Sequence, residues 1–524
     1  MSAAATPQRI AGFETEKVID SSRRTPPFTA QAVAGLLIYS VFLLTATAII
    51  ASRRHLWWDE IQTMLVATLP SMKAIWNALL LGADWQSPGI FLPLHYLFEI
   101  FGPSTLVGRL IGIVPYWLAT LVVYYAVARR TAPRYGFVAM LFPCITGAFA
   151  YSFEMRPYAF VLLFTACTFL SWQLTKEQRF RRFALPALTI SLGALVCIHY
   201  NACLVALPLL VGEAAIVLRR RKFDFPALIA MCCAALPLLA LTPHIHAIRQ
   251  YSAVYRMPHD FSTFVELYVG LFSRLILLLP AVCAAYFVWR AVRGPVRSTS
   301  VPSEDEGPRY WEIVAAAAFL TLPIVYFFLS LYTGALHYRH VLDTIIGVSI
   351  LVGFLCYAWR EAPPFAPIAL GLLCFNLAFT ISHRLRQPDE NGWGTYTRYK
   401  DLFQPSSPFP NDGEAIVMGA GPYLLAYKYG TPALAQRSYY VMADPSWKQV
   451  APEAVYNHNF YYAWKTMLPP GAIHAASYAS FLQTHDRFLL YNPDAWLLKR
   501  LTQDGHRVEV KDILEYGPVY SVSN

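Results

Sequence analysis

Long apolar runs, separated by short polar segments, occupy most of the chain up to residue 385. A helix needs about 20 mostly apolar residues to cross the hydrocarbon core of a bilayer. The run from 183 to 218 is too long for one crossing, and we divide it at the polar residues His199, Tyr200 and Asn201. The pattern then predicts about eleven transmembrane helices, at residues 31–51, 105–127, 135–153, 157–174, 183–199, 201–218, 226–247, 271–289, 311–332, 340–359 and 364–382.

Composition excludes a soluble enzyme with an ordinary polar surface. Hydrophobic residues make up 56% of the 524 residues and charged residues 14%, whereas a soluble domain has about 25% charged residues. The mean hydropathy is +0.40. All nine cysteines lie in apolar segments and no Cys-x-x-Cys motif occurs, so we interpret them as core residues rather than disulfide partners or zinc ligands.

The positive charges predict the orientation. With the N-terminus in the cytoplasm, the segments between spans on the inner side hold 20 Lys and Arg, against seven in the outer loops. This asymmetry follows the positive-inside rule, so the net charge of +10 reflects topology and does not indicate nucleic-acid binding. We predict a cytoplasmic tail at 1–30, a transmembrane domain at 31–382 with a long outer loop at 52–104, and an outer domain at 383–524.

The outer domain has the pattern of a small α/β fold. Apolar strand-like segments at 415–418, 488–491 and 507–510 alternate with helical segments at 423–429 and 494–501. Residues 419–421, Gly-Ala-Gly, resemble the start of a dinucleotide-binding loop, but Leu424 stands where the third glycine would be needed, so this signal is weak. The predicted fold class is an all-α polytopic membrane protein with a small C-terminal α/β domain.

Polar groups capable of chemistry gather on the predicted outer side. Loop 52–104 contains Trp57-Trp58-Asp59-Glu60 and is broken by Pro88 and Pro93, which predicts interfacial helices forming a lid. Residues 154–158 read Glu-Met-Arg-Pro-Tyr, and residues 337–340 read His-Tyr-Arg-His. A carboxylate at membrane depth is costly unless it is paired or faces a polar cavity. We therefore predict that these three segments share one outward-facing cavity.

These motifs, in this order, resemble the GT-C superfamily of glycosyltransferases. The resemblance rests on residues 57–60, Leu92-Pro93-Leu94-His95-Tyr96, Arg109 and residues 154–158, and it extends over about 50–385. Within the superfamily the chain is most similar to bacterial relatives of the dolichyl-phosphate-mannose protein mannosyltransferases and of the lipid A aminoarabinose transferases. The resemblance implies a polyprenyl-phosphate sugar donor, an active site outside the bacterial cytoplasmic membrane, Asp59 as catalytic base and Glu154 as the second carboxylate. An Arg-Tyr pair of the family falls at Arg339-His340, where this sequence departs from the pattern.

Elementary chemistry agrees with that assignment. A polyprenyl phosphate leaves without needing a proton, so an inverting transfer requires one base for the acceptor hydroxyl and cations for the departing phosphate. Asp59 is the candidate base, and the alternative is a helix N-cap or ion-pair partner. Glu60 is a catalytic candidate that could instead orient its neighbour, and Glu154 with Arg156 could orient substrate or form an ion pair.

The remaining candidates bind the donor or line the cavity. Because outer cations are few, we predict donor phosphate binding by Arg53, Lys73 and Arg339. Predicted cavity residues are Arg156, Tyr158, His199, Tyr200, His337 and His340. We expect no required cofactor; a divalent cation between His337 and His340 is the alternative to a hydrogen-bonding role. The expected partners are the polyprenyl-phosphate sugar and a lipid, glycan or protein acceptor, with no nucleic acid.

Two other functions fit a multispan chain. A transporter or lipid flippase could use the intramembrane carboxylates Glu213 and Asp343 as a relay, although no internal repeat supports it. A membrane scaffold would bind a partner through its outer domain. The sequence identifies neither the sugar nor the acceptor.

Overall fold

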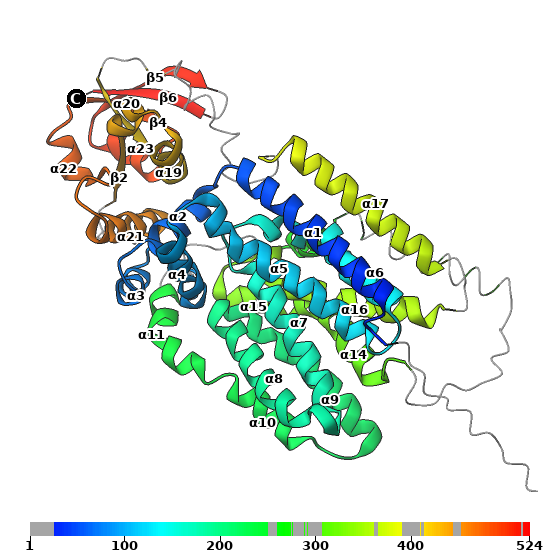
Figure 1. The fold of residues 1–524 in the computed structure, drawn as a ribbon. Helices are drawn as coiled ribbons and strands as arrows, with labels where there is room; N and C mark the ends of the chain where they lie inside the picture. Colours follow the sequence, from blue (N-terminus) through cyan, green and yellow to red (C-terminus); the bar gives the residue numbers. More distant parts are fainter. Residues whose placement is uncertain are drawn as a thin grey trace, which may run out of the picture.

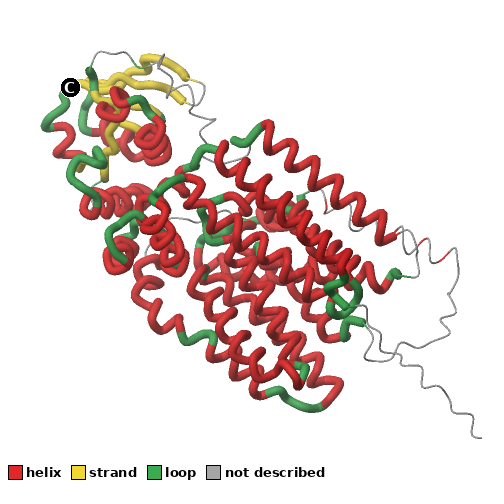
Figure 2. Tube along the Cα trace, viewed as in Figure 1, coloured by secondary structure: helices red, strands yellow, loops and turns green. Residues whose placement is uncertain are grey.

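The computed structural model describes residues 26–249, 259–273, 307–360, 365–389, 413–443, 452–514 and 517–523, with the single residues 275, 284, 288, 291 and 409. A helical bundle forms most of the molecule, and a strand-containing domain lies at one end of it (Figure 1). All strands in the described residues belong to that C-terminal domain (Figure 2). This arrangement confirms the predicted fold class.

Within the described residues, eight helices or helix pairs are long and apolar enough to cross a membrane, or nine if one bent pair forms a single span. They are α1 (Ala30–Arg53), α5 (Thr105–Ala128), α7 (Tyr158–Thr175), α8 (Gln178–Ile198), η4 with α9 (Tyr200–Val205, Ala206–Arg220), α10 with α11 (Phe225–Cys233, Pro237–Arg249), α14 with α15 (Tyr310–Ala318, Leu322–Thr333) and α17 (Phe365–Arg386). Each of them coincides with a predicted span.

Three predicted spans differ from this group. Residues 135–153 form α6 (Pro133–Leu141) and the 3-10 segments η2 (Phe142–Ile145) and η3 (Gly147–Phe153), with a bend of 79°. Pro143 cannot donate a helical hydrogen bond, and a Cβ at Gly147 would lie 2.1 Å from the carbonyl oxygen of Gly270. Residues 340–359 form the shorter apolar helix α16 (Asp343–Ala358), and 271–289 lies mostly outside the described residues. The count of eleven therefore stays a prediction.

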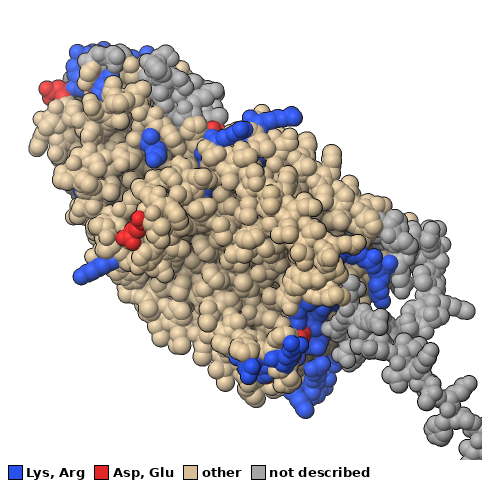
Figure 3. Space-filling model, in the orientation of Figure 1, with Lys and Arg blue, Asp and Glu red and all other residues tan. Residues whose placement is uncertain are grey.

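Local sequence sets the ends of the bundle helices. The Thr29 side chain accepts a hydrogen bond from the Ala32 N–H at 3.1 Å and caps the start of α1. Gly334, at φ +78°, ends α15 in the left-handed conformation that glycine adopts at little cost. Between the two ends, Figure 3 shows a wide belt without charged side chains, which fits the hydrocarbon core of a bilayer.

Loop 52–104 folds into short helices, as predicted. These are α2 (Trp58–Ala67), α3 (Met72–Leu80), η1 (Pro88–Ile90) and α4 (Phe91–Phe101). Pro88 begins η1, where its missing N–H has no helical partner to lose. The three α-helices lie between the bundle and the C-terminal domain (Figure 1). We call them, with η1, the lid helices.

The C-terminal domain contains a six-stranded sheet of order β3-β2-β1-β4-β6-β5. The strands are β1 (Ala415–Met418), β2 (Ser438–Met442), β3 (Ala475–Ser477), β4 (Arg487–Tyr491), β5 (Arg507–Leu514) and β6 (Gly517–Ser523). Neighbours from β3 to β4 are parallel, whereas β6 pairs antiparallel with both β4 and β5. The accompanying helices are α19 (Ala420–Tyr429), α20 (Pro432–Arg437), α21 (Pro452–Met467), α22 (Tyr478–Leu482) and α23 (Ala495–Gln503).

This domain packs directly on the lid helices. A Cβ at Gly421 would lie 2.1 Å from the Trp58 ring, so α19 approaches α2 at a position that only glycine allows. The Leu56 N–H donates to the Tyr429 hydroxyl at 2.6 Å, and the rings of Trp85 and Phe460 stack with centroids 5.8 Å apart. The domain therefore supports the loop that carries Asp59.

Candidate active site

Asp59 lies in the first turn of α2 between two arginines from distant parts of the chain. Its Oδ2 is 3.3 Å from Arg156 Nη2 and 3.4 Å from Arg339 Nη1. The side chains of Asp59 and Arg339 are 16% and 25% exposed and that of Arg156 is 7% exposed. Asp59 therefore remains accessible, and the structure brings together one residue from each of the three polar segments.

The two guanidinium groups have unused hydrogen-bonding capacity. In the described part of the chain, the buried Nε atoms of Arg156 and Arg339 have no hydrogen-bond partner, and neither has Nε1 of Trp57. The Trp57 ring centroid is 6.0 Å from the Arg156 guanidinium carbon and 5.9 Å from that of Arg339. Buried N–H donors seldom lack an acceptor, so this corner of the site is suited to binding an anionic ligand.

Glu60, the next residue, points into the protein. Its carboxylate accepts hydrogen bonds from Arg109 Nε at 2.9 Å, Arg109 Nη2 at 2.8 Å and the Met155 N–H at 2.8 Å. Both charged side chains of the pair are 0% exposed. Burial opposes ionisation of Glu60, but the ion pair with Arg109 outweighs it and lowers the pKa of the carboxyl group. Glu60 therefore has no access to a substrate in this arrangement.

Arg109 ties Glu60 to the chain between α1 and α2. Its guanidinium also donates to the carbonyl oxygens of Ala51, Arg54 and His55, at 2.7, 2.6 and 3.0 Å. These carbonyls lie at the end of α1 and in the turn that precedes Trp57 and Asp59. Arg109 and Glu60 thus fix the backbone that presents Asp59.

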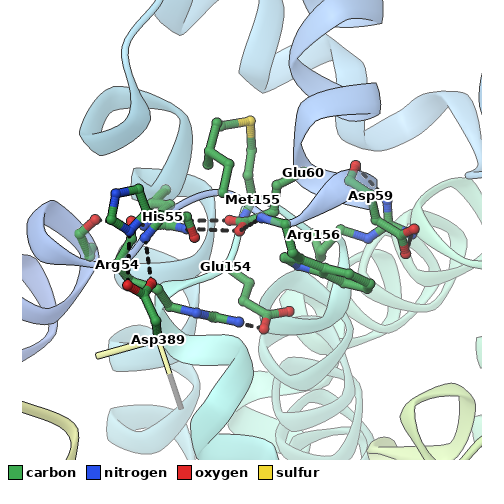
Figure 4. A network of polar contacts seen from close by, with 12 residues as sticks. Arg54, His55, Asp59, Glu60, Glu154, Met155, Arg156 and Asp389 are labelled. Carbon is green, nitrogen blue, oxygen red and sulfur yellow. Dashed lines mark hydrogen bonds and ion pairs between the residues drawn. The ribbon is translucent and has the colours of Figure 1, made fainter. Parts of the chain in front are cut away.

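Glu154 belongs to the same buried network (Figure 4). Its Oε1 accepts from Arg54 Nη1 at 2.9 Å. Burial raises the pKa of Glu154, and the neighbouring Arg54 only partly opposes that rise. On the other side of the turn, the Asp389 carboxylate accepts from the His55 N–H at 2.8 Å and lies 2.8 Å from His55 Nδ1. The structure therefore places Glu154 beside Arg54 rather than beside Arg156.

A further carboxylate that was not among the predicted site residues, Asp84, approaches from the loop before η1. Its oxygens accept from the Gln86 N–H at 3.1 Å and from Gln86 Nε2 at 2.9 Å, and Oδ2 is 3.9 Å from Arg156 Nη1. Burial raises its pKa despite Arg156. In the sequence, the only signal was an acidic residue flanked by an aromatic one in a lid loop.

Three histidines lie near Arg339, and the Arg339 backbone N–H donates to His337 Nδ1 at 3.2 Å. The rings of His199 and His340 have centroids 5.3 Å apart, and those of His337 and His340 are 6.3 Å apart. Tyr158 lies against His199 at 5.9 Å. Burial and nearby Arg339 lower the pKa of His199 to about 4 and that of His337 to about 3. The imidazoles are therefore neutral near pH 7 and can each donate one hydrogen bond.

The described residues contain no group of three or more His, Cys, Asp or Glu side chains arranged to hold a metal ion. The Tyr326 hydroxyl and His340 Nδ1 form a hydrogen bond of 2.5 Å, so one ring nitrogen of His340 already has a protein partner. The hydroxyl of Tyr200, another predicted cavity residue, is hydrogen-bonded to His244 Nδ1 at 2.6 Å. Both His340 and Tyr200 therefore have hydrogen-bond partners within the protein.

Two predicted phosphate ligands lie elsewhere. Arg53 is exposed and lines a hollow with residues of α17, such as Ile381 and Arg386. Lys73 is an exposed residue of α3. In the described residues, neither side chain has an ion-pair partner. Of the three predicted phosphate ligands, the structure therefore brings only Arg339 to Asp59.

Comparisons with known proteins concern the family and the fold. Residues 86–246 match the profile of the family described as dolichyl-phosphate-mannose-protein mannosyltransferase. The chain is similar to the crystal structure of ArnT from Cupriavidus metallidurans bound to undecaprenyl phosphate, with 12% identity and a TM-score of 0.53, over 94% of this chain and 98% of that one. An oligosaccharyltransferase from Archaeoglobus fulgidus, in complex with zinc and sulfate, matches with 14% identity and a TM-score of 0.40, over 76% and 61%. No curated protein matches the sequence.

The match to the mannosyltransferase family confirms the resemblance predicted from the motif order. The likeness to ArnT shows the fold, a multi-pass helical membrane domain followed by a small strand-containing domain. The matched family profile covers the lid region from Gln86 and the helices up to α11. That segment includes Arg109, Glu154 and Arg156, which hold or contact the loop of Asp59.

Proposed function

We propose that this chain is a membrane glycosyltransferase that moves a sugar from a polyprenyl-phosphate donor to an acceptor hydroxyl on the outer side of the bacterial cytoplasmic membrane. The observation that carries the proposal is the partly exposed carboxylate of Asp59, set between Arg156 and Arg339. The matched mannosyltransferase profile and the fold shared with ArnT, crystallised with undecaprenyl phosphate, support the same donor class.

The reaction needs a base and an anion site close together. Asp59 accepts the proton of the acceptor hydroxyl while that oxygen forms a bond to the anomeric carbon of the sugar. The bond between this carbon and the phosphate oxygen breaks, and its electron pair leaves with the polyprenyl phosphate. Attack opposite to the leaving group inverts the anomeric centre. Arg339 stabilises the negative charge on the phosphate, with the unused N–H groups of Arg156 and Trp57 close by.

The other predicted residues divide into two roles. Glu60 and Glu154 act as positioning residues, because Arg109 and Arg54 bind them inside the protein. Neutral His199, His337 and His340, with Tyr158, offer hydrogen-bonding groups for sugar hydroxyls. Arg53 and Lys73 are outside the proposed donor site. The proposed reaction requires no cofactor.

Charge distribution supports the orientation. Lys and Arg gather at the end of the bundle away from the C-terminal domain (Figure 3). Arg129 and Arg130 directly follow α5, and Arg220 ends α9. The positive-inside rule assigns that end to the cytoplasm. Asp59, the lid helices and the C-terminal domain then lie on the outer side.

The direct test is sugar transfer by the purified full-length chain in lipid. The donors are a panel of labelled polyprenyl-phosphate sugars, and the acceptor is an extract of native membranes. We expect one or more donors to be consumed with label appearing in an acceptor, and the Asp343→Asn variant to behave like the wild type. Failure of every donor both to react and to bind would contradict the proposal, and loss of activity in Asp343→Asn would favour a relay transporter.

A further inference from the structure

A groove runs along the surface of the bundle between its first and last described helices. α1 and α17 lie side by side at one edge of the bundle (Figure 1). Two hollows of about 410 and 660 Å³ adjoin there, and both are lined by Phe42, Ile381 and Leu385. The larger hollow has only aliphatic and aromatic residues and Thr45 in its lining, with no charged side chain among them. This groove is suited to an extended hydrocarbon chain.

Two arginines close one end of the groove. Arg53, in the last turn of α1, and Arg386, the last residue of α17, both line the smaller hollow. Both side chains are exposed, and neither has an ion-pair or hydrogen-bond partner in the part of the chain that the structure describes. Under the orientation proposed above, they lie at the outer membrane interface, where the positive-inside rule makes Lys and Arg uncommon.

Arg54, the residue next to Arg53, shows that Arg53 and Arg386 are not part of the Asp59 site. Successive residues of a helix are about 100° apart, and Arg54 turns inward to Glu154 while Arg53 turns toward α17. Arg54 is therefore accounted for by a buried ion pair, whereas Arg53 and Arg386 are exposed and line the groove. Their convergence at the end of an apolar groove matches a molecule with an anionic head and a hydrocarbon tail.

We propose that the groove between α1 and α17 binds an anionic glycerophospholipid. Its phosphate lies between Arg53 and Arg386, and one acyl chain follows Phe42, Ile381 and Leu385 toward the middle of the membrane. Two cations at the head favour a lipid with net negative charge over a zwitterionic one. The donor's polyprenyl phosphate is a different occupant, because its phosphate must reach the sugar-transfer site beside Asp59 and Arg339.

A lipid held there would also fasten α17 to α1 close to the active-site turn. Asp389 lies three residues after Arg386. Its carboxylate accepts a hydrogen bond from the backbone N–H of His55 and contacts Nδ1 of the His55 ring. The His55 carbonyl oxygen in turn accepts from Arg109. The site therefore lies at the start of a chain of contacts that ends at the backbone presenting Asp59.

Native mass spectrometry of the full-length protein tests the proposal. Phosphatidylglycerol and phosphatidylcholine are titrated against the wild type, the double variant Arg53→Gln/Arg386→Gln, and the control Arg182→Gln, an exposed arginine at the other end of the bundle. We expect the wild type to bind phosphatidylglycerol more tightly than phosphatidylcholine, and the double variant to lose about tenfold or more in affinity for phosphatidylglycerol alone. The control should match the wild type.

A second variant tests the groove without changing charge. Ala378 is an exposed residue of α17 that lines the smaller hollow, so Ala378→Trp should obstruct the acyl chain and reduce retention of phosphatidylglycerol. Thermal unfolding of each variant establishes that it is folded. Equal affinity for the two lipids in the wild type, or unchanged phosphatidylglycerol binding in both variants, would overturn the proposal. One-for-one displacement of phosphatidylglycerol by polyprenyl phosphate would also overturn it, by identifying the groove as a carrier site.

Discussion

Among the residues that the structure describes, Glu60 is the one carboxylate in direct contact with buried Arg109. Replacing Glu60 by Gln removes this counter-charge while keeping the shape of the side chain. Arg109 Nε and Nη2 lose two charge-assisted hydrogen bonds, now 2.9 and 2.8 Å long. Such bonds contribute about 1.5–3 kcal/mol each. Breaking a fully buried ion pair costs about 3–5 kcal/mol. Since three carbonyl oxygens still contact Arg109, we expect a loss of stability of about 3–5 kcal/mol.

The assay is reversible unfolding of the full-length protein, in lipid or detergent, monitored for wild type, Glu60→Gln and a matched control. Glu99→Gln is that control, because Glu99 is a lid-helix carboxylate that is 52% exposed and lies 3.4 Å from His95. Exposed pairs contribute less than about 1 kcal/mol. If Glu60→Gln were no more destabilising than Glu99→Gln, Arg109 would be hydrated, and the positioning role assigned to the network would be refuted.

Three further predictions concern the site and its support. Arg339→Gln should lower the transfer rate by about 10²–10³-fold at unchanged thermal stability, since it removes one preorganised hydrogen-bond donor to the leaving phosphate. Steady-state kinetics and thermal unfolding check this, and an equal loss of rate in Lys73→Gln would contradict it. Gly421→Ala should lower turnover while the protein stays folded, because the added Cβ displaces Trp58 next to Asp59. The control is Gly471→Ala, which reports the general effect of changing a glycine in this domain. An added Cβ at Gly471 meets nothing within 4 Å, although the backbone there has φ +80°. In the folded protein the pKa values of His199 and His337 are lowered to about 4 and about 3, below the unfolded value near 6.5. The unfolded chain therefore binds protons first, and the free energy of unfolding falls as the pH drops from about 6.5 toward 4. The difference in unfolding free energy between about pH 7.5 and about pH 5 should be smaller in His199→Gln/His337→Gln than in the wild type.

Much of the fold followed from hydropathy, because a bilayer imposes one length on every crossing helix. The spans at α1, α5, α7, α8 and α17 coincide with apolar runs of about that length. The broken segment 133–153 escaped this reasoning because its composition is that of a span, whereas its bend results from Pro143 and from contact between Gly147 and the distant Gly270. A length criterion carries no information on such contacts.

In the C-terminal domain, the strands β1, β4 and β5 were predicted at least in part, whereas β2, β3 and β6 were missed. β1 (Ala-Ile-Val-Met) is buried along its whole length between parallel neighbours, which gives a clear pattern. β3 has three small residues, Ala475 to Ser477, and β6 alternates weakly around Val519 and Val522. Backbone hydrogen bonds to the neighbouring strands, rather than an apolar sequence of their own, stabilise such strands.

At the site, the placement of the polar segments on the predicted outer side, together with the order of the motifs, predicted which segments would meet, but not which neighbouring side chain would face inward. Asp59 and Arg339 are 280 residues apart, and their predicted place on the outer side linked them. Arg53 and Arg54 are adjacent and identical in type, and only the rotation of α1 assigns one to the lipid-facing groove and the other to Glu154. Asp84 was missed because its partners come from distant segments, Thr63 from α2 and Arg156 from the turn before α7.

The central claim is that Asp59 removes the acceptor proton while Arg339 holds the donor phosphate, and a comparison of donor binding with single-turnover transfer tests it most directly. Both quantities are measured for wild type, Asp59→Asn and Arg339→Gln, using the donor that the wild type consumes. The account predicts that Asp59→Asn binds the donor about as well as the wild type but transfers at least about 10²-fold more slowly, and that Arg339→Gln binds the donor more weakly. Transfer by Asp59→Asn at the wild-type rate would contradict it.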